Sequence, residues 1–257
     1  MRTARVIGIW IVAAALVGAA GQQEVQESLA RLDASRMALG DAREMASVKT
    51  MSLTGTLRLR NQYFGKMPDA TQEFVSSRFD TKILLPDHYV EALDMGIGIR
   101  ISGFAGSTLL NRAVLPDGRI DTDPSTAEMM NAERARVGYL MLALLLRTDT
   151  AFPFAFRSAS GDTLTFKGGD GVEVLVDLDP ATQLPARLRF DATVSTVSGV
   201  SKGAKVATTV ELGDYRTVGR LRLPHHHATS RKGVLYSDRQ FELIELNSPI
   251  TPDDFRK

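Results

Sequence analysis

The stretch VGYLMLALLL, residues 137 to 146, is apolar at every position except Gly138. Ten residues are too few to cross a membrane, and a helix that is apolar nearly all round must be buried on most sides. Segments that alternate apolar and polar residues flank this stretch in the sequence. We therefore expect a buried helix that packs against, or lies in the mouth of, a curved antiparallel sheet.

The ends of this helix carry local signals. Asp123 is a candidate N-cap, Pro124 suits the first helical position, and Ser125 to Glu128 match a capping box. Arg147 would place a cation in the last turn, where it interacts favourably with the helix dipole. The pattern predicts a helix from Pro124 to Arg147, with the apolar stretch in its second half.

Strands are indicated on both sides of the helix. In the clearest one, Met51 to Arg60, apolar residues alternate with polar ones, which is typical of a half-buried strand. Similar segments run up to Val114 and again from Phe154 to Leu246. Short turns separate them, among them Pro116 to Gly118 and Asp214 to Gly219, and short connections favour antiparallel pairing. About ten strands and two helical segments make the chain mainly β (α+β).

An N-terminal helix is predicted from Gln22 to Val48. Gly40 is expected to end or kink it, because glycine tolerates the left-handed cap conformation. Asp41 can then cap a second short turn that reaches Met45. The apolar stripe of the first part consists of Val25, Leu29, Leu32 and Met37.

The first twenty residues have the features of a secretory signal peptide. Arg2 and Arg5 form a basic start, Val6 to Val17 is an apolar run, and the small residues Gly18 to Gly21 follow it. The run is shorter than the roughly 20 apolar residues of a membrane span, which disfavours the rival interpretation of an uncleaved anchor. We expect cleavage after Ala20 or the next residue, and export to the periplasm.

Cleavage would leave residues 21–257 as one domain, a size that is common for all-β folds. The whole chain has 31 Lys and Arg against 30 Asp and Glu, so removal of Arg2 and Arg5 leaves 29 against 30. This near-neutral balance indicates no nucleic-acid partner. The chain contains no cysteine, so it needs no disulfide and cannot carry a lipid on an N-terminal cysteine.

Three segments resemble a known family. These are the strand VKTMSLTGTLRL (Val48–Leu59), the stretch DYRTVGRLRLPH (Asp214–His225), and the close Leu246-Asn247-Ser248-Pro249-Ile250 through Phe255. Together with the order of elements, they resemble the outer-membrane lipoprotein carrier superfamily, the LolA/LolB-like fold. The resemblance implies an incomplete antiparallel barrel with helices as a lid, whose concave apolar face takes lipid or lipoprotein acyl chains.

The resemblance and the face assignments suggest a set of residues for the wall of a ligand cavity. They are Leu57, Leu59, Ile99, Ile101, Phe104, Leu140, Met141 and Leu144. Two interpretations of residues 137 to 146 stay open. The helix is either a lid over a ligand cavity or an ordinary core helix that fills the barrel.

No motif in the sequence indicates catalysis. In a strand, His225 and His227 face one way and His226 the other, and two ligands are too few for a closed zinc site. No serine has the strand–turn–helix context of a nucleophile. We expect no enzyme activity, no metal and no cofactor.

The sequence thus favours a monomeric periplasmic binding protein that holds a lipid or a lipidated protein, with a transient membrane or protein partner in the envelope. The alternative is an envelope sensor or interaction module of the same fold with no carrier role. For that alternative, the Gly/Ser/Lys loop from Ser198 to Lys205 is the candidate partner face.

Overall fold

The computed structural model describes residues 7–60, 70–122, 126–194 and 204–256, with side chains from residue 22 onward except at 193, 194 and 204. Thirteen strands in these ranges form one antiparallel sheet in the order β6-β5-β4-β3-β2-β1-β13-β12-β11-β10-β9-β8-β7. The strands are β1 (Thr50–Arg60), β2 (Phe74–Leu84), β3 (His88–Asp94), β4 (Ile99–Ala105), β5 (Thr108–Val114), β6 (Ile120–Thr122), β7 (Phe154–Ser160), β8 (Thr163–Gly168), β9 (Glu173–Leu178), β10 (Pro185–Val194), β11 (Ala204–Val218), β12 (Leu221–Arg231) and β13 (Val234–Leu246).

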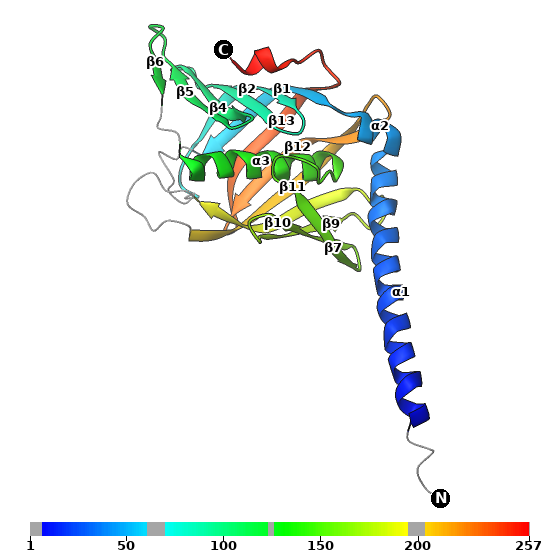
Figure 1. The fold of residues 1–257 in the computed structure, drawn as a ribbon. Coiled ribbons are helices and arrows are strands. Elements are labelled where there is room, and N and C mark those ends of the chain that lie inside the picture. The colour runs from blue at the N-terminus through cyan, green and yellow to red at the C-terminus, as the bar shows by residue number, and fades with distance from the viewer. Residues whose placement is uncertain (1–6, 61–69, 123–125, 195–203, 257) are drawn as a thin grey trace, which may run out of the picture.

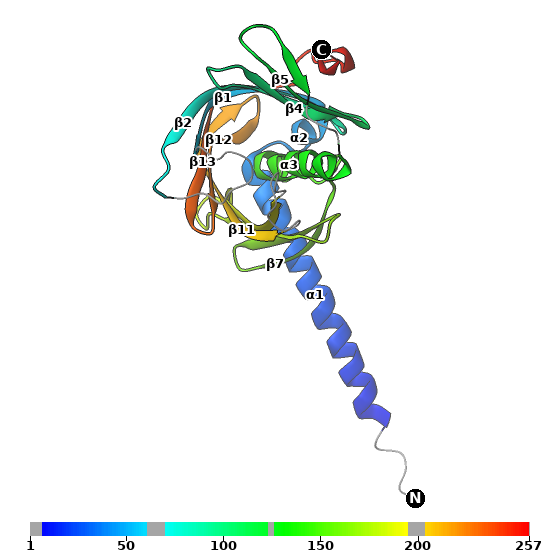
Figure 2. The same cartoon turned by 90° about the vertical axis from the view of Figure 1, so that its left-hand side faces the viewer.

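The sheet is strongly curved but does not close, because its two end strands, β6 and β7, do not pair with each other. Figure 2 shows the strands wrapping around helix α3 (Ala127–Leu145), which connects those two end strands in the sequence. The incomplete antiparallel barrel with helices on its concave side is therefore confirmed. Thirteen strands replace the expected ten or so, partly because β6 has only three residues, too few to show alternation.

The alternation in β1 decides which side chains face inward. Met51, Leu53 and Leu57 are buried, whereas the residues between them are at least partly accessible, except the glycine at position 55. Side chains of directly paired residues lie on the same face of a sheet, so the inward face continues through Phe79 of β2. This buried face is the concave side of the sheet, and the polar side chains of β1 lie on the convex side.

Helix α3 begins later than the sequence indicated. Its N-cap is Thr126, whose side chain accepts a hydrogen bond from the backbone N–H of Met129 at 3.1 Å. Residues 123 to 125, which include the expected cap Asp123, lie outside the described residues. Thr126 can cap because its extended backbone aims its hydroxyl at the free N–H groups of the first turn.

The helix also ends before Arg147. Leu146 takes a left-handed conformation (φ 49°) and its N–H bonds to the carbonyl of Leu142. Arg147 therefore does not complete the last turn of α3. Its guanidinium donates instead to the carbonyl of Val48 at 2.5 Å, which caps helix α2 (Ala42–Ser47), and pairs with Asp149 at 2.7 Å. The predicted cation does meet a helix C-terminus, but that of α2.

The N-terminal helix α1 spans Ile7–Leu39. Its first part projects away from the sheet (Figure 1), whereas Leu32 and Leu39 near its end are buried in the core. The predicted break is confirmed, because Gly40 follows with φ 136° and Asp41 caps α2 through the N–H groups of Arg43 and Glu44. None of the helices in the described residues combines the length and apolarity needed to span a membrane. Cleavage of residues 1–20 stays a prediction.

The sequence predicted a turn from Asp214 to Gly219, but β11 continues through Val218. Asp214 has φ 51°, but the strand pairing with β12 keeps the same register before and after it. Gly219 then makes the turn into β12 with φ 62°, and the next N–H, of Arg220, donates to the Glu44 carboxylate at 3.0 Å. The family-like motif thus fixes the β11–β12 turn against α2.

The C-terminal segment folds back on the sheet. A short 3₁₀ helix, η1 (Pro252–Phe255), buries Phe255, whose ring lies 5.2 Å from that of His88. Lys82 of β2 pairs with Asp254 at 3.2 Å. The C-terminal segment therefore packs across β2 and β3 on the convex side of the sheet.

Gly138 allows α3 to approach the start of β7. A Cβ at this position would lie 2.9 Å from the carbonyl oxygen of Phe152 and 2.9 Å from a ring carbon of Phe154.

Gly138→Val should therefore lower the free energy of unfolding by about 1–3 kcal/mol, as overpacking does elsewhere. Urea unfolding followed by circular dichroism measures this. Ala132→Val, on the exposed side of α3, is the matched control; an equal loss in both variants would contradict the prediction.

Candidate functional site

The second half of α3 packs against the concave face of the sheet. Met141, Leu142, Leu144 and Leu145 have no exposed surface, and Val137 is 1% exposed. A helical segment with this burial requires apolar neighbours on most sides. The expected buried helix is confirmed. With α3 packed on the sheet, the helix occupies much of the space inside the curve of the sheet.

Aromatic rings line the part of the concave face formed by β7 to β10. Tyr139 of α3 stacks on Phe190 of β10 with ring centroids 4.1 Å apart and planes at 11°. Four further rings continue this wall, namely Phe152, Phe154, Phe156 and Phe166. Sequence reasoning did not select these residues. The sequence did contain a pattern that could have identified two of them. Alternation placed Phe166 and Phe190 on the same strand faces as neighbouring valines and leucines.

Most of the eight predicted wall residues lie on the concave side. Leu57, Phe104, Met141 and Leu144 are buried there, and Leu59 and Leu140 are half-buried and pack against the same core. The structure thus brings six of the eight to one face. Their role in binding stays a prediction.

Ile99 and Ile101 are not part of that group. In β4 the register pairs Tyr89 with Phe104 and Glu91 with Ser102, and these four residues face α3. Strand alternation then places Ile99 and Ile101 on the convex side, where Ile99 is 42% exposed. Their apolar alternation was interpreted as the inward face, but the inward face of this strand carries Ser102, which meets Arg136 of α3, together with the buried Phe104.

A polar cluster lies under the first half of α3. Glu91 of β3, with a side chain only 6% exposed, accepts hydrogen bonds from Thr81 at 3.0 Å and from Arg239 of β13 at 2.6 Å. Arg136 of α3 donates to the same carboxylate and to the hydroxyl of Tyr89. One carboxylate therefore joins α3 to strands that are remote in the sequence.

The charges of this cluster hold Glu91 ionised. Burial by itself raises the pKa of Glu91, but the guanidinium groups of Arg136 and Arg239 outweigh it, and the net pKa is lowered to about 2. Removing one partner would leave a buried charge unpaired. The free-energy cost of that unpaired charge is far larger than the stabilisation that the intact pair provides. The cluster therefore fixes where α3 docks rather than adding much to overall stability.

The three consecutive histidines divide between the two faces, as predicted. His225 and His227 are buried on the concave side, and His226 bonds to Asp238 at 2.6 Å on the convex side. Burial, reinforced by the charge of Arg239, lowers the pKa of His227 to about 3. Across the described ranges, no three His, Cys, Asp or Glu side chains gather in a metal-binding arrangement.

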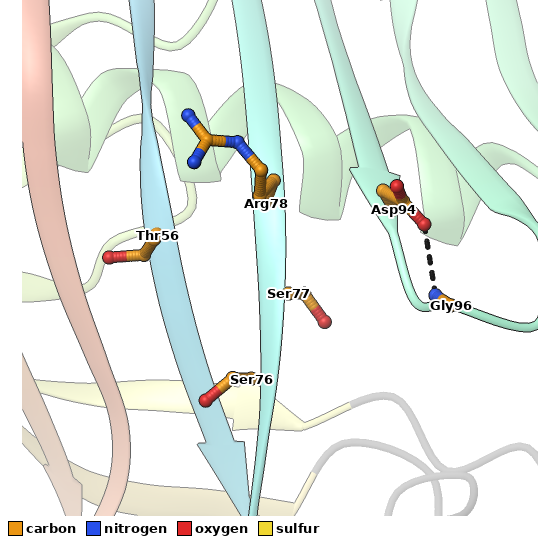
Figure 3. Close-up of a pocket in the computed structure, with 6 residues that line it drawn as sticks. All are labelled: Thr56, Ser76, Ser77, Arg78, Asp94 and Gly96. Carbon is orange, nitrogen blue, oxygen red and sulfur yellow. Dashed lines mark hydrogen bonds between the residues drawn. The ribbon is translucent and has the colours of Figure 1, made fainter.

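A surface pocket of about 270 Å³ lies at β1–β3 (Figure 3). It is lined by Thr56, Ser76, Ser77, Arg78, Asp94 and Gly96. Its charged groups already have partners, since Arg78 pairs with Glu242 at 2.9 Å and Asp94 accepts from Gly96 N–H at 2.9 Å. It contains no predicted wall residue and is smaller than most sites for small organic ligands.

Comparison with known proteins supports the fold. No family model and no curated protein sequence matches the chain. Similar solved structures include a domain from Vibrio parahaemolyticus described as an outer membrane lipoprotein-sorting protein (12% identity, TM-score 0.49, 90% of this chain and 96% of that one). Others are a DUF1329 family protein from Desulfovibrio piger (6%, 0.50, 89% and 96%) and a LolA superfamily protein from Nitrosomonas europaea (11%, 0.44, 90% and 97%).

At these identities the likeness concerns the fold alone. At that level it confirms the half-barrel architecture that the sequence resemblance implied.

The lowered pKa of His227 predicts acid sensitivity. Above pH 6.5 the residue is neutral in both states, but below it the unfolded chain binds a proton that the folded chain excludes. Stability should therefore fall by about 1.4 kcal/mol per pH unit between roughly pH 6 and 4.5 from this group. Glu91 contributes a further loss only as pH falls from 4.5 toward 2, since its folded pKa is depressed.

His227→Phe should flatten the slope of unfolding free energy between pH 6 and 4.5. Urea titrations at steps of half a pH unit measure it. Above pH 7 the difference between the two proteins should be constant, which serves as the internal control. Identical slopes in both proteins would contradict the assignment.

Proposed function

We propose that this protein binds a lipid acyl chain, free or attached to a lipidated protein, between α3 and the concave face of its half-barrel. The observation that carries the proposal is the position of α3. An apolar helix lies in the mouth of a sheet that does not close, and it is the covalent link between the two open edges. Such a helix can leave the concave face without breaking any strand pairing.

The concave face is suited to an extended apolar ligand. The aromatic wall on β7–β10 and the leucines of β1 form one continuous apolar surface together with α3. Burial of a methylene group stabilises binding by roughly 0.8 kcal/mol before ordering costs, so a long acyl chain can offset the contacts it takes from α3. Because these contacts are not directional, a ligand can replace one set of apolar neighbours by another.

The predicted signal peptide supports an envelope location. A carrier in the periplasm would shield acyl chains from water between two membranes. The wall we propose consists of Leu57, Leu59, Phe104, Leu140, Met141 and Leu144, joined by the rings of Tyr139, Phe156 and Phe190, which are not fully buried.

The second candidate function is an interaction module with no carrier role. The convex side of β4 to β6 favours it, because Ile97 is 73% exposed, Ile99 42% and Ile120 60%. Ile99 and Ile120 are both paired with Val114 and so lie on one face. The predicted partner loop from Ser198 to Lys205 lies mostly outside the described residues. Binding of an acyl ligand inside the barrel distinguishes the carrier from this module.

Native mass spectrometry of the protein purified from the cell envelope should show a bound lipid, and lipid extraction should release it. A fluorescent fatty acid should bind the delipidated protein. Leu140→Gln should weaken that binding about tenfold, because the amide would lie in an apolar contact without a partner. Leu140 is only half-buried, so the variant should fold.

Ala132→Gln, on the exposed side of the same helix, is the matched control and should bind as the parent protein does. A protein that carries no lipid and binds no fatty acid would refute the carrier function. Binding unaffected by Leu140→Gln would refute the place assigned to the ligand.

A further inference from the structure

Two polar side chains border the apolar region directly. Arg239 of β13 and His227 of β12 are register partners, and both face the concave side. Arg239 is also paired with Leu57, one of the proposed wall residues on β1. Its guanidinium lies over the ring of Phe79 at 4.4 Å, and the imidazole of His227 packs edge-on against Phe241 at 4.9 Å. The two polar groups are therefore held by aromatic packing at the edge of the apolar surface.

Both groups have hydrogen-bonding capacity to spare. His227, 6% exposed, has a buried Nε2 with no hydrogen-bond partner among the described residues. A buried polar atom without a partner is costly and calls for an explanation. Within the described ranges, Arg239 donates one hydrogen bond, from Nη1 to Glu91 at 2.6 Å, although a guanidinium carries five N–H donors. An oxygen between these side chains could accept from both.

The charges beside this pair are balanced, because the guanidinium groups of Arg136 and Arg239 meet the carboxylates of Glu91 and Glu133. The free N–H donors of Arg239 and the unpartnered Nε2 of His227 nevertheless favour an anionic oxygen over a neutral one. Hydrogen bonds to an ionised acceptor are roughly twice as strong as those between neutral groups.

We infer that Arg239 and His227 form the head-group subsite of the binding region, for the carboxylate or phosphate of an anionic amphiphile. The inference rests on the proposed function and adds the chemical class of the ligand. The acyl chain runs from this subsite past Leu57 along the apolar face. Glu91 stays paired with Arg239 and orients its guanidinium, while His227, neutral and protonated on Nε2, donates to the head-group oxygen.

The test compares ligands that share their acyl chains, one member of each pair with an anionic head group and the other without one. Oleate is paired with methyl oleate, and dioleoylphosphatidylglycerol with dioleoylglycerol, each displacing an uncharged fluorescent acyl probe at pH 7.4. The anionic member of a pair should bind roughly tenfold more tightly than the neutral one, as expected for hydrogen bonds to a charged group. The pair with the larger ratio identifies the source of the anion, carboxylate or phosphate.

Two variants probe the subsite, and a third variant is the control. Arg239→Met and His227→Phe should each bring the ratio of anionic to neutral affinity toward one, with binding of the neutral ligands retained. His227→Phe keeps an aromatic ring in the core, so it carries the test if Arg239→Met does not fold. Arg58→Met removes an exposed arginine on the convex side of β1 and should leave the ratio unchanged.

The outcomes separate the two proposals. Equal affinity for anionic and neutral ligands in the parent protein overturns the head-group subsite and leaves the carrier function standing. An anionic preference that survives both variants places the subsite elsewhere and also overturns the inference. If neither member of either pair binds, the proposed function itself fails.

Discussion

The packing of α3 into an unclosed sheet is the contact on which the rest of the structure depends. A curved sheet of thirteen strands has a concave apolar face, and its edges β6 and β7 do not meet. Without α3, the residues of that face would be in contact with water. The helix covers them with an apolar surface of its own, and Gly138 lets it approach the start of β7 closely. The same contact excludes water and stands where we propose that a ligand enters.

The interface of α3 has two halves with different physical roles. The second half, from Val137 onward, is held by burial of apolar area, which is strong but tolerates a change of partners. The first half is held by the buried Glu91 and the arginines around it, and ion pairs of this kind specify geometry more than they add stability. A helix docked in one position by charges, yet covering a surface that accepts other apolar groups, has the properties of a lid.

Sequence reasoning placed most of the proposed wall residues on the concave face and misplaced two. It selected Leu57 and Leu144 correctly as inward-facing, because alternation in β1 and the apolar stretch of α3 leave no other side for them. It selected Ile99 and Ile101 for the same reason, and the structure places both on the convex side. The polar Ser102 on the inward face of β4 is explained only by Arg136 of α3, which reaches both Ser102 and Glu91.

The sequence by itself determined the local elements. Period-two alternation specifies strands, Gly40 and Asp41 end one helix and begin the next, and a ten-residue apolar run requires burial. These signals depend on neighbours within a few residues. Only the tertiary structure decided which face of each strand is concave, that Arg147 caps α2, and that Arg239 and His227 lie beside Leu57. Alternation tells which residues share a face, but the inward face is set by sheet curvature and by the docking of α3, which join residues far apart in the chain.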